Sequence, residues 1–553
     1  MRIAPQATPF LGRLITYALL TAAVAVLAYH LALECATLGL PEPMGYPEVV
    51  YRGIARVWPH QYQLGHFVDA QDNYGPGYST FCRPFLALGM DPYVAARAAN
   101  LAALSGASLI LLGVLRSYRI SGALSLAVTA LFFALNAGSS SLQARPDFLE
   151  SLLILALLAA GRPSFLECRG TLSAALLIGL LGLGAFLTKP YGLLAWGTAA
   201  AYPFVSGGVV RFSRRSLAIA AISSGVIVLG IAAYASANPY FLTETVVFHF
   251  VHRDPGSGAF LLQLRDFSGL ACGLVATAAA GLVLGRRKPG APGWISDPER
   301  GYWVFALALG AAALGLGLGW HRGAYLTYYY HLLLPPLAVV AAFACESIEP
   351  SVAAIALTAN CALLVALAPA LPKPDPEWER LAHDLALQKG PVVVDFMLEP
   401  LAAGRLDARV AGNGINRFAL DLPDRVGGLR SAREEVVAYV QSEREVIRKG
   451  PPPEAIYMDC YLFAKRPGDP RVADGGYLAV PRNEHPLLLN GYDMDHYVPV
   501  GLFVLHPFYG SQNSPRQQAG TWIMTVVKFV RLGRGHDPSP AERLPFALVA
   551  PAG

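Results

Sequence analysis

The chain has 553 residues, of which 54% are hydrophobic and only 15% are charged. Soluble proteins carry about a quarter charged residues, so this composition excludes an ordinary soluble enzyme and predicts a polytopic membrane protein with some soluble mass. The net charge is +5, and the basic residues are scattered among the connections between apolar runs. Because nucleic-acid binding needs a clustered basic face, we expect no nucleic-acid partner.

The first apolar run, residues 10–33, is long enough to span a membrane and shows no clear secretory cleavage pattern, so it predicts a retained anchor. Since a span needs about twenty apolar residues, the candidate spans in chain order are 10–33, 94–115, 120–138, 148–161, 171–188, 191–206, 216–236, 268–285, 302–319, 328–345 and 351–371. With the N-terminus in the cytoplasm, every inner connection but the last is basic, as the positive-inside rule requires. We therefore expect about eleven helices in a bacterial inner (plasma) membrane.

This orientation places the loop 34–93 and the ARPD segment at 144–147 on the extracytoplasmic side. An odd number of spans also places the tail there. The tail holds three apolar runs, PVVVDF, EAIYMDCYLF and TWIMTVVKFV, that predict strands. We expect residues 1–371 to form the transmembrane domain and residues 372–553 to form an extracytoplasmic α/β or α+β domain. Cys35 and Cys82 could form a disulfide if both lie outside the cytoplasm.

The loop 34–93 is the most informative segment, because long ordered loops are usually functional. It carries Glu48, Asp69 and Asp72, and the last of these immediately precedes a rigid YGPGY turn. Carboxylates held beside hydrocarbon are costly and tend to be functional. These carboxylates predict proton chemistry at the membrane surface.

The order of motifs resembles the GT-C superfamily of membrane glycosyltransferases, and within it the bacterial dolichyl-phosphate-mannose protein mannosyltransferase-like branch. The motifs are PE followed by YRGIAR, then DAQDNYGPGY, VAARAANL, ARPD, LTKPYGL and TYYYHLLLPPLAV. The resemblance covers roughly residues 10 to 345. Many members carry an Asp-Glu pair at the start of the first loop, where this chain has Pro47 and Glu48.

The resemblance implies an inverting transfer of a sugar from a polyprenyl-phosphate carrier to an acceptor glycan, lipid or protein. Such a step needs a base for the acceptor proton and cations or dipoles for the leaving phosphate. Glu48 or Asp72 is the expected base. Glu48 could instead be a helix N-terminal charge, and Asp72 could be a turn residue.

Lys189, Arg253 and Arg322 are the cations expected to bind the donor phosphate. Lys189 ends an apolar run and has no acidic neighbour in the sequence, so it needs a partner that a lipid phosphate would supply. Its alternative role is to extend toward the headgroups of the surrounding membrane lipid.

The expected substrate contacts come from short segments at the outer ends of spans. Asp147 could be a helix cap instead, and the histidines could belong to a metal site or an interfacial aromatic belt. The expected contacts are Asp147, Arg145, Tyr74, Tyr78, His249 and His331. Nothing in the sequence requires a metal or another cofactor.

Two other classes remain open. A transporter or flippase of a lipid-linked solute should show internal repeats and charges in the middle of its spans, whereas this chain keeps its charges at the ends of spans. A non-catalytic membrane scaffold would tolerate amide substitutions at the loop carboxylates. The sequence therefore favours a membrane glycosyltransferase of the cell envelope.

Overall fold

The computed structural model describes most of the chain and forms two compact units. The membrane unit is Met1–Gly39, Asn73–Leu371 and Gly510–Ala519, and the sheet unit is Leu40–Asp72, Pro372–Tyr509 and Gly520–Gly553. The described residues are 8–41, 48, 51–52, 54–55, 58–60, 62, 74–140, 145–205, 213–238, 241–242, 245–246, 259–284, 294, 297–320, 332–368, 370–371, 373–395, 398–402, 408–410, 451–464, 477–481, 496–505, 524–533, 538–539, 542–544 and 546–548.

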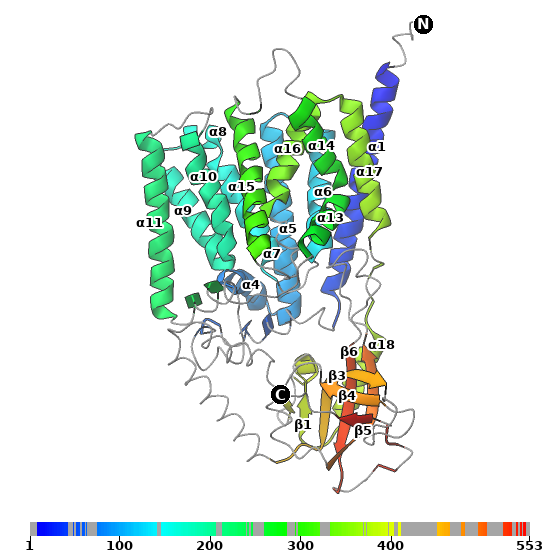
Figure 1. Ribbon diagram of the computed structural model, residues 1–553. Helices are drawn as coiled ribbons and strands as arrows, with labels where there is room; N and C mark the ends of the chain where they lie inside the picture. The colour runs from blue at the N-terminus through cyan, green and yellow to red at the C-terminus, as the bar shows by residue number, and fades with distance from the viewer. Residues whose placement is uncertain are drawn as a thin grey trace. The chain divides into compact units, whose positions relative to one another are not determined.

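The membrane unit is a bundle of helices that run up and down beside one another (Figure 1). Its helices are α1 (Thr8–Leu38), α4 (Gly77–Ala87), α5 (Pro92–Ser117), α6 (Gly122–Ser140), α7 (Asp147–Gly161), α8 (Pro163–Glu167), α9 (Thr171–Thr188), η1 (Pro190–Gly192), α10 (Leu193–Val205), α11 (Arg214–Ala237), α13 (Ala259–Leu270), α14 (Cys272–Leu284), α15 (Pro298–Trp320), α16 (Leu334–Ser347) and α17 (Pro350–Ala366).

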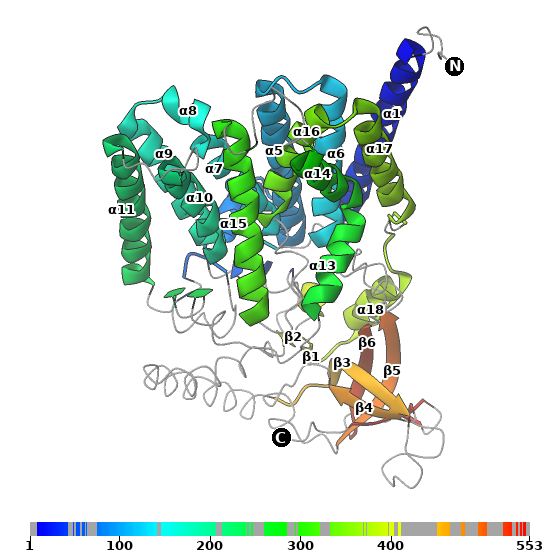
Figure 2. The same cartoon turned by 45° about the horizontal axis from the view of Figure 1, so that its top comes forward.

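Four described helices are long and apolar enough to cross a membrane by themselves, namely Leu11–Leu38, Pro92–Ser117, Thr171–Thr188 and Arg214–Ala237. A bent pair, Leu264–Leu270 and Cys272–Val283, turns by 90° and adds a fifth if it forms one span (Figure 2). The protein is therefore an integral membrane protein. The expected count of eleven spans stays a prediction, although a helix overlaps each of the predicted apolar runs.

The described helices meet along small residues. A Cβ on Gly161 would lie 2.3 Å from the Cβ of Ala199, and a Cβ on Gly281 would lie 2.1 Å from the Cβ of Ala344. Such contacts let helix backbones approach closely, which is how helices associate in a membrane. They join α7 to α10 and α14 to α16.

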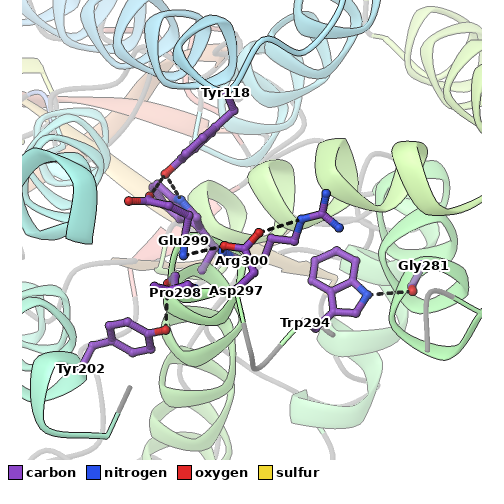
Figure 3. Close-up of polar contacts among 9 residues, drawn as sticks. Tyr118, Tyr202, Gly281, Trp294, Asp297, Pro298, Glu299 and Arg300 are labelled. Atoms are coloured by element: carbon purple, nitrogen blue, oxygen red, sulfur yellow. Dashed lines mark hydrogen bonds and ion pairs between the residues drawn. The ribbon is translucent and has the colours of Figure 1, made fainter. Parts of the chain in front are cut away.

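A network of hydrogen bonds ties several helices together at the end of the bundle that holds α8 (Figures 1 and 3). Glu299 at the start of α15 accepts from the hydroxyl of Tyr118 at 2.5 Å and from the backbone N–H of Ser164 at 2.5 Å. Arg162 donates to Ser117 Oγ at 2.7 Å. Burial raises the pKa of the Tyr118 phenol, and the Glu299 carboxylate raises it further.

A second group of contacts at this end holds the start of α15. Tyr202 donates to the carbonyl of Pro298 at 2.8 Å, and the indole of Trp294 donates to the carbonyl of Gly281 at 3.0 Å (Figure 3). Arg300 forms an ion pair with Asp297 at 3.4 Å. This end of the unit is thus fixed by polar contacts between helices.

The sheet unit contains a seven-stranded sheet covered by α18 (Pro376–Leu387). Its strands are β1 (Val392–Val394), β2 (Ala408–Val410), β3 (Ala455–Ala464), β4 (Tyr477–Pro481), β5 (Tyr497–Leu505), β6 (Met524–Arg531) and β7 (Phe546–Leu548), and α19 (Glu399–Ala402) follows β1. β1 pairs in parallel with β2 and β3, while β6 pairs antiparallel with β3 and β5. The three strands predicted in the tail are confirmed as β1, β3 and β6.

The core of the sheet unit on the α18 side is built from apolar residues of β1, β3, β5 and β6. Trp378, Leu381 and Leu385 of α18 are buried against Val392 and Val394 of β1. The mixture of parallel strands and covering helix gives the α/β or α+β character expected from the sequence. The proposed domain boundary at residue 371, and the assignment of the loop 34–93 to the transmembrane domain, stay predictions.

The cysteines correct one expectation. Cys35 and Cys82 are not joined by a disulfide; Cys35 is exposed and Cys82 is buried. The disulfide hypothesis rested only on both residues lying on one side of the membrane, which does not require their side chains to meet.

Candidate functional site

The described part of the membrane unit holds one fully buried lysine–carboxylate pair. Lys189 Nζ contacts Asp147 Oδ1, and the side chains of both residues are at most 1% exposed. The two residues are 42 positions apart in the sequence. Burying a charge without a partner lowers stability by roughly several kcal/mol. Each of these two side chains therefore makes the burial of the other possible.

The local backbone explains how Lys189 reaches this position. α9 ends at Thr188, and Lys189 takes an extended conformation with φ −149° and ψ 132° before the short turn η1. Pro190 at the start of η1 cannot continue α9, because proline lacks the backbone N–H of a helix interior. The lysine is therefore turned out of the helix toward the start of α7, where Asp147 is the first residue after Pro146.

Two tyrosine rings complete the surroundings of the lysine ammonium. Its Nζ atom lies 4.6 Å from the centroid of the Tyr74 ring and 5.4 Å from that of the Tyr191 ring. Both distances lie within the range of cation–π attraction. The ammonium is thus surrounded by a carboxylate and two aromatic faces.

The YGPGY turn packs directly against the end of α9. A Cβ on Gly75 would lie 1.9 Å from the carbonyl oxygen of Leu187, and one on Gly77 would lie 2.5 Å from Thr188 Oγ1. Gly75 also donates its backbone N–H to the carbonyl of Thr188 at 3.4 Å. These glycines let the turn approach the backbone closely enough to bring Tyr74 to Lys189.

Tyr78 has a different position from the one expected of a substrate contact. It lies on α4, is buried, and donates its hydroxyl to the carbonyl of Ala96 on α5 at 3.4 Å. This contact holds α4 against α5. A substrate role for Tyr78 stays a prediction.

Glu150 is an acidic residue of this cluster that the sequence reasoning did not single out. It lies one helical turn after Asp147 on the same face of α7 and is 0% exposed. Its Oε1 atom packs against Gly192, where a Cβ would lie 2.4 Å away. Among the described residues, neither carboxylate oxygen of Glu150 has a hydrogen-bond partner. The DFLE spacing was the signal that could have found it.

Four charged side chains interact electrostatically here, namely Arg145, Asp147, Glu150 and Lys189. The charges of Lys189 and Glu150 attract each other, and the charge of Asp147 acts on both. The positive charge of Arg145, which is only partly buried, also acts on Lys189. We call Asp147, Glu150, Lys189, Tyr74 and Tyr191 the lysine cluster. It can hold charge in an apolar environment, where electrostatic interactions are stronger than in water.

The other predicted site residues are not part of the described cluster. Glu48 is fully buried in the sheet unit, and the described positions around it are helical, as the sequence predicted. The remaining predicted residues lie outside the described residues, namely Asp72, Arg253, Arg322, His249 and His331.

The described residues contain no group of three or more His, Cys, Asp or Glu side chains that could hold a metal ion. The histidine segments that suggested the metal alternative lie outside the described residues, so that alternative is untested.

The chain shares its fold with solved membrane-protein structures, in agreement with the fold that the resemblance of its motifs to the GT-C superfamily implies. Two solved structures that share this fold are those of ArnT from Cupriavidus metallidurans. The structure bound to undecaprenyl phosphate has a TM-score of 0.51 and 15% identity, and the apo structure has a TM-score of 0.50 and 16% identity. Each comparison covers 80% of this chain and 96% of ArnT.

A third solved structure, the arabinofuranosyltransferase AftD from Mycobacteria, gives a TM-score of 0.46 at 16% identity and covers 94% of this chain and 40% of AftD. No protein-family model matches the sequence, and no curated protein matches it. At identities this low, the structural likeness to ArnT establishes the fold alone. The activity must be argued from the site.

Proposed function

We propose that this protein transfers a sugar from a polyprenyl-phosphate carrier to an acceptor, with inversion, at the end of the membrane unit that holds the lysine cluster. The observation that carries the proposal is the buried Lys189–Asp147 pair with a second carboxylate, Glu150, beside it. Apolar residues in place of these charged side chains would make the helical bundle at least as stable. Charged residues buried in this way usually serve function.

The position of the cluster supports a lipid-linked donor. It lies at the helix ends, on α7 and the turn after α9, so a group at the membrane boundary could reach it. A structure with the same fold, that of ArnT, holds undecaprenyl phosphate. Arg145 and Lys189, with Arg253 and Arg322, are the cations that we propose stabilise the leaving phosphate.

The opposite end of the bundle supports an extracytoplasmic location for the cluster. Basic residues gather there, with Arg162 bonded to Ser117 and Arg215 bonded to the carbonyl of Arg169. Cytoplasmic ends of membrane proteins carry such an excess. We infer that the N-terminus is cytoplasmic, that the protein lies in a bacterial inner membrane, and that the lysine cluster and the sheet unit are extracytoplasmic.

The base is proposed to be Asp72 or Glu48. Asp72 precedes Tyr74 by two residues in the sequence, and the ring of Tyr74 lies 4.6 Å from Lys189 Nζ. Glu48 is buried and lies in a helical segment of the same loop. The proposed substrate contacts stay those expected from the sequence, namely Asp147, Arg145, Tyr74, Tyr78, His249 and His331.

The proposal is tested with purified full-length protein in liposomes and a panel of polyprenyl-phosphate sugars that differ in the sugar. Release of polyprenyl phosphate is measured with and without extracts of bacterial cell-envelope glycans, lipids and proteins as acceptors. We expect one donor to be consumed and its sugar to appear on an acceptor. Transport of a donor across the bilayer without its cleavage would favour the transporter alternative and contradict the proposal.

A further inference from the structure

Glu150 is the one acid of the lysine cluster that the proposed chemistry leaves without a task. Both of its oxygens are buried without a hydrogen-bond partner among the described residues. The conventional expectation is that buried polar groups are hydrogen-bonded, so an exception asks for an explanation.

The surroundings of Glu150 connect it to Lys189. Glu150 Oε1 packs against Gly192, and the backbone N–H of Gly192 donates to the carbonyl of Lys189 at 3.0 Å. The turn that carries the lysine therefore passes directly over the Glu150 carboxylate. The charges of the two side chains attract each other, and both carboxylates lie on one face of α7, one turn apart.

Lys189 is bonded to Asp147 in this structure, while its flexible four-carbon stem lets an ammonium change partners. We propose that Glu150 is a second partner for the Lys189 ammonium, which moves to Glu150 when a sugar hydroxyl of the substrate takes over Asp147. Glu150 is thus a positioning residue that acts through Lys189. The inference rests on the proposed function in one respect, which is that the group displacing the lysine is a sugar hydroxyl.

The exchange explains why the cluster has two carboxylates for one ammonium. A sugar hydroxyl that bonds to Asp147 Oδ1 competes there with the Lys189 ammonium and weakens the bond between the two side chains. A lysine that left Asp147 and was not in contact with the donor phosphate would keep its charge buried and uncompensated, which is strongly unfavourable. Glu150 provides that partner within the same apolar environment.

The experiment is a double-mutant cycle read by thermal unfolding of the purified full chain in detergent, which needs no substrate. In the wild-type background we expect Glu150→Gln to change Tm by less than about 1 °C, because the carboxylate has no hydrogen-bond partner to lose. In the Asp147→Asn background, Lys189 depends on Glu150, so the same substitution should lower Tm by about 3 °C or more. Equal Tm shifts in the two backgrounds would overturn the proposal.

The matched control is Glu34→Gln, because Glu34 on α1 is also buried and its Oε2 atom has no hydrogen-bond partner among the described residues. We expect Glu34→Gln to shift Tm equally in both backgrounds. If Asp147→Asn does not yield folded protein, the Lys189→Met background decides instead. There Glu150→Gln should raise Tm more than in wild type, and an equal shift would reject the coupling.

The activity readout separates this role from a space-filling one. With a donor that the wild type consumes, Glu150→Gln should lower kcat about tenfold and leave the donor KM unchanged, because the ground-state pair of Lys189 and Asp147 is kept. An unchanged kcat would overturn the proposal. If no donor is consumed by wild type, the proposed function fails while the Tm cycle still decides the exchange.

Discussion

Gly75 and Leu187 are in backbone contact: a Cβ on Gly75 would stand 1.9 Å from the carbonyl oxygen of Leu187. No rotamer can relieve this contact, because the obstructing atom belongs to the backbone of α9. The YGPGY turn can therefore bring Tyr74 to Lys189 only with glycine at position 75.

Gly75→Ala should displace this turn and lower both stability and transfer. We expect a loss of about 1 to 3 kcal/mol in stability from the forced shift. A misplacement of about 1 Å near the reacting groups can reduce turnover about 10²-fold. Tm and the rate of polyprenyl-phosphate release measure the two effects. Gly113→Ala on α5, where a Cβ meets nothing within 4 Å, is the control and should leave transfer unchanged without lowering Tm.

Substituting both members of the Lys189–Asp147 pair should lower stability less than substituting Lys189 alone. Lys189→Met leaves a buried carboxylate without its ammonium and should destabilise the protein by about 3 to 5 kcal/mol. Adding Asp147→Leu removes the uncompensated charge, so the double variant should recover most of the lost Tm. Recovery of stability without recovery of transfer would show that the pair is kept for function. A double variant less stable than Lys189→Met would contradict this assignment.

The two candidate bases can be separated by amide substitution. Glu48→Gln and Asp72→Asn keep the shape of each side chain and remove its ability to accept a proton. General base catalysis contributes about 10² to 10⁴ to a rate, so substitution of the true base should reduce turnover by that factor while donor binding persists. Steady-state transfer and binding of the donor by thermal shift measure the two quantities. Wild-type turnover in both variants would contradict the assignment of a loop carboxylate as base.

Tyr118, at the opposite end of the bundle, should make the stability of the protein depend on pH. Because its pKa is raised in the folded protein, the folded chain keeps this proton where the unfolded chain, with a pKa of about 10, loses it. The contribution of Tyr118 to stability is therefore present below about pH 10 and is lost as the pH rises further. The Tm of the wild type should fall between about pH 10 and 11 more steeply than that of Tyr118→Phe. Identical pH profiles would contradict the raised pKa of Tyr118 that burial and the Glu299 carboxylate produce.

The helices could be predicted because the length of an apolar run indicates a membrane-spanning helix. The predicted span 171–188 matches α9 (Thr171–Thr188), and the strands β1, β3 and β6 lie in the runs chosen for them. The length of the hydrophobic stretch and its composition determine these elements locally. The break inside the predicted span 268–285, where α13 and α14 meet at 90°, was not predicted.

The lysine cluster could be predicted only in part. The sequence placed Asp147 and Lys189 on the same side of the membrane, and the structure brings them together with Tyr74. Their pairing was missed, because Lys189 has no acidic neighbour in the sequence and the contact crosses 42 positions. Glu150 was missed because it lies inside an apolar run, where its burial depends on packing against η1. Such contacts arise from tertiary structure, and the only local signal for them was the DFLE spacing, which puts two acids on one face of a helix.

The most direct test of the account compares wild type with the Lys189→Met, Asp147→Leu double variant in liposomes that contain the donor consumed by wild type. The double variant keeps the fold and lacks the charged pair, so a difference in rate reports on the chemistry of the lysine cluster. We predict that it releases polyprenyl phosphate at least about 10²-fold more slowly than wild type at equal Tm. Release at the wild-type rate by the folded double variant would contradict the claim that transfer takes place at this cluster.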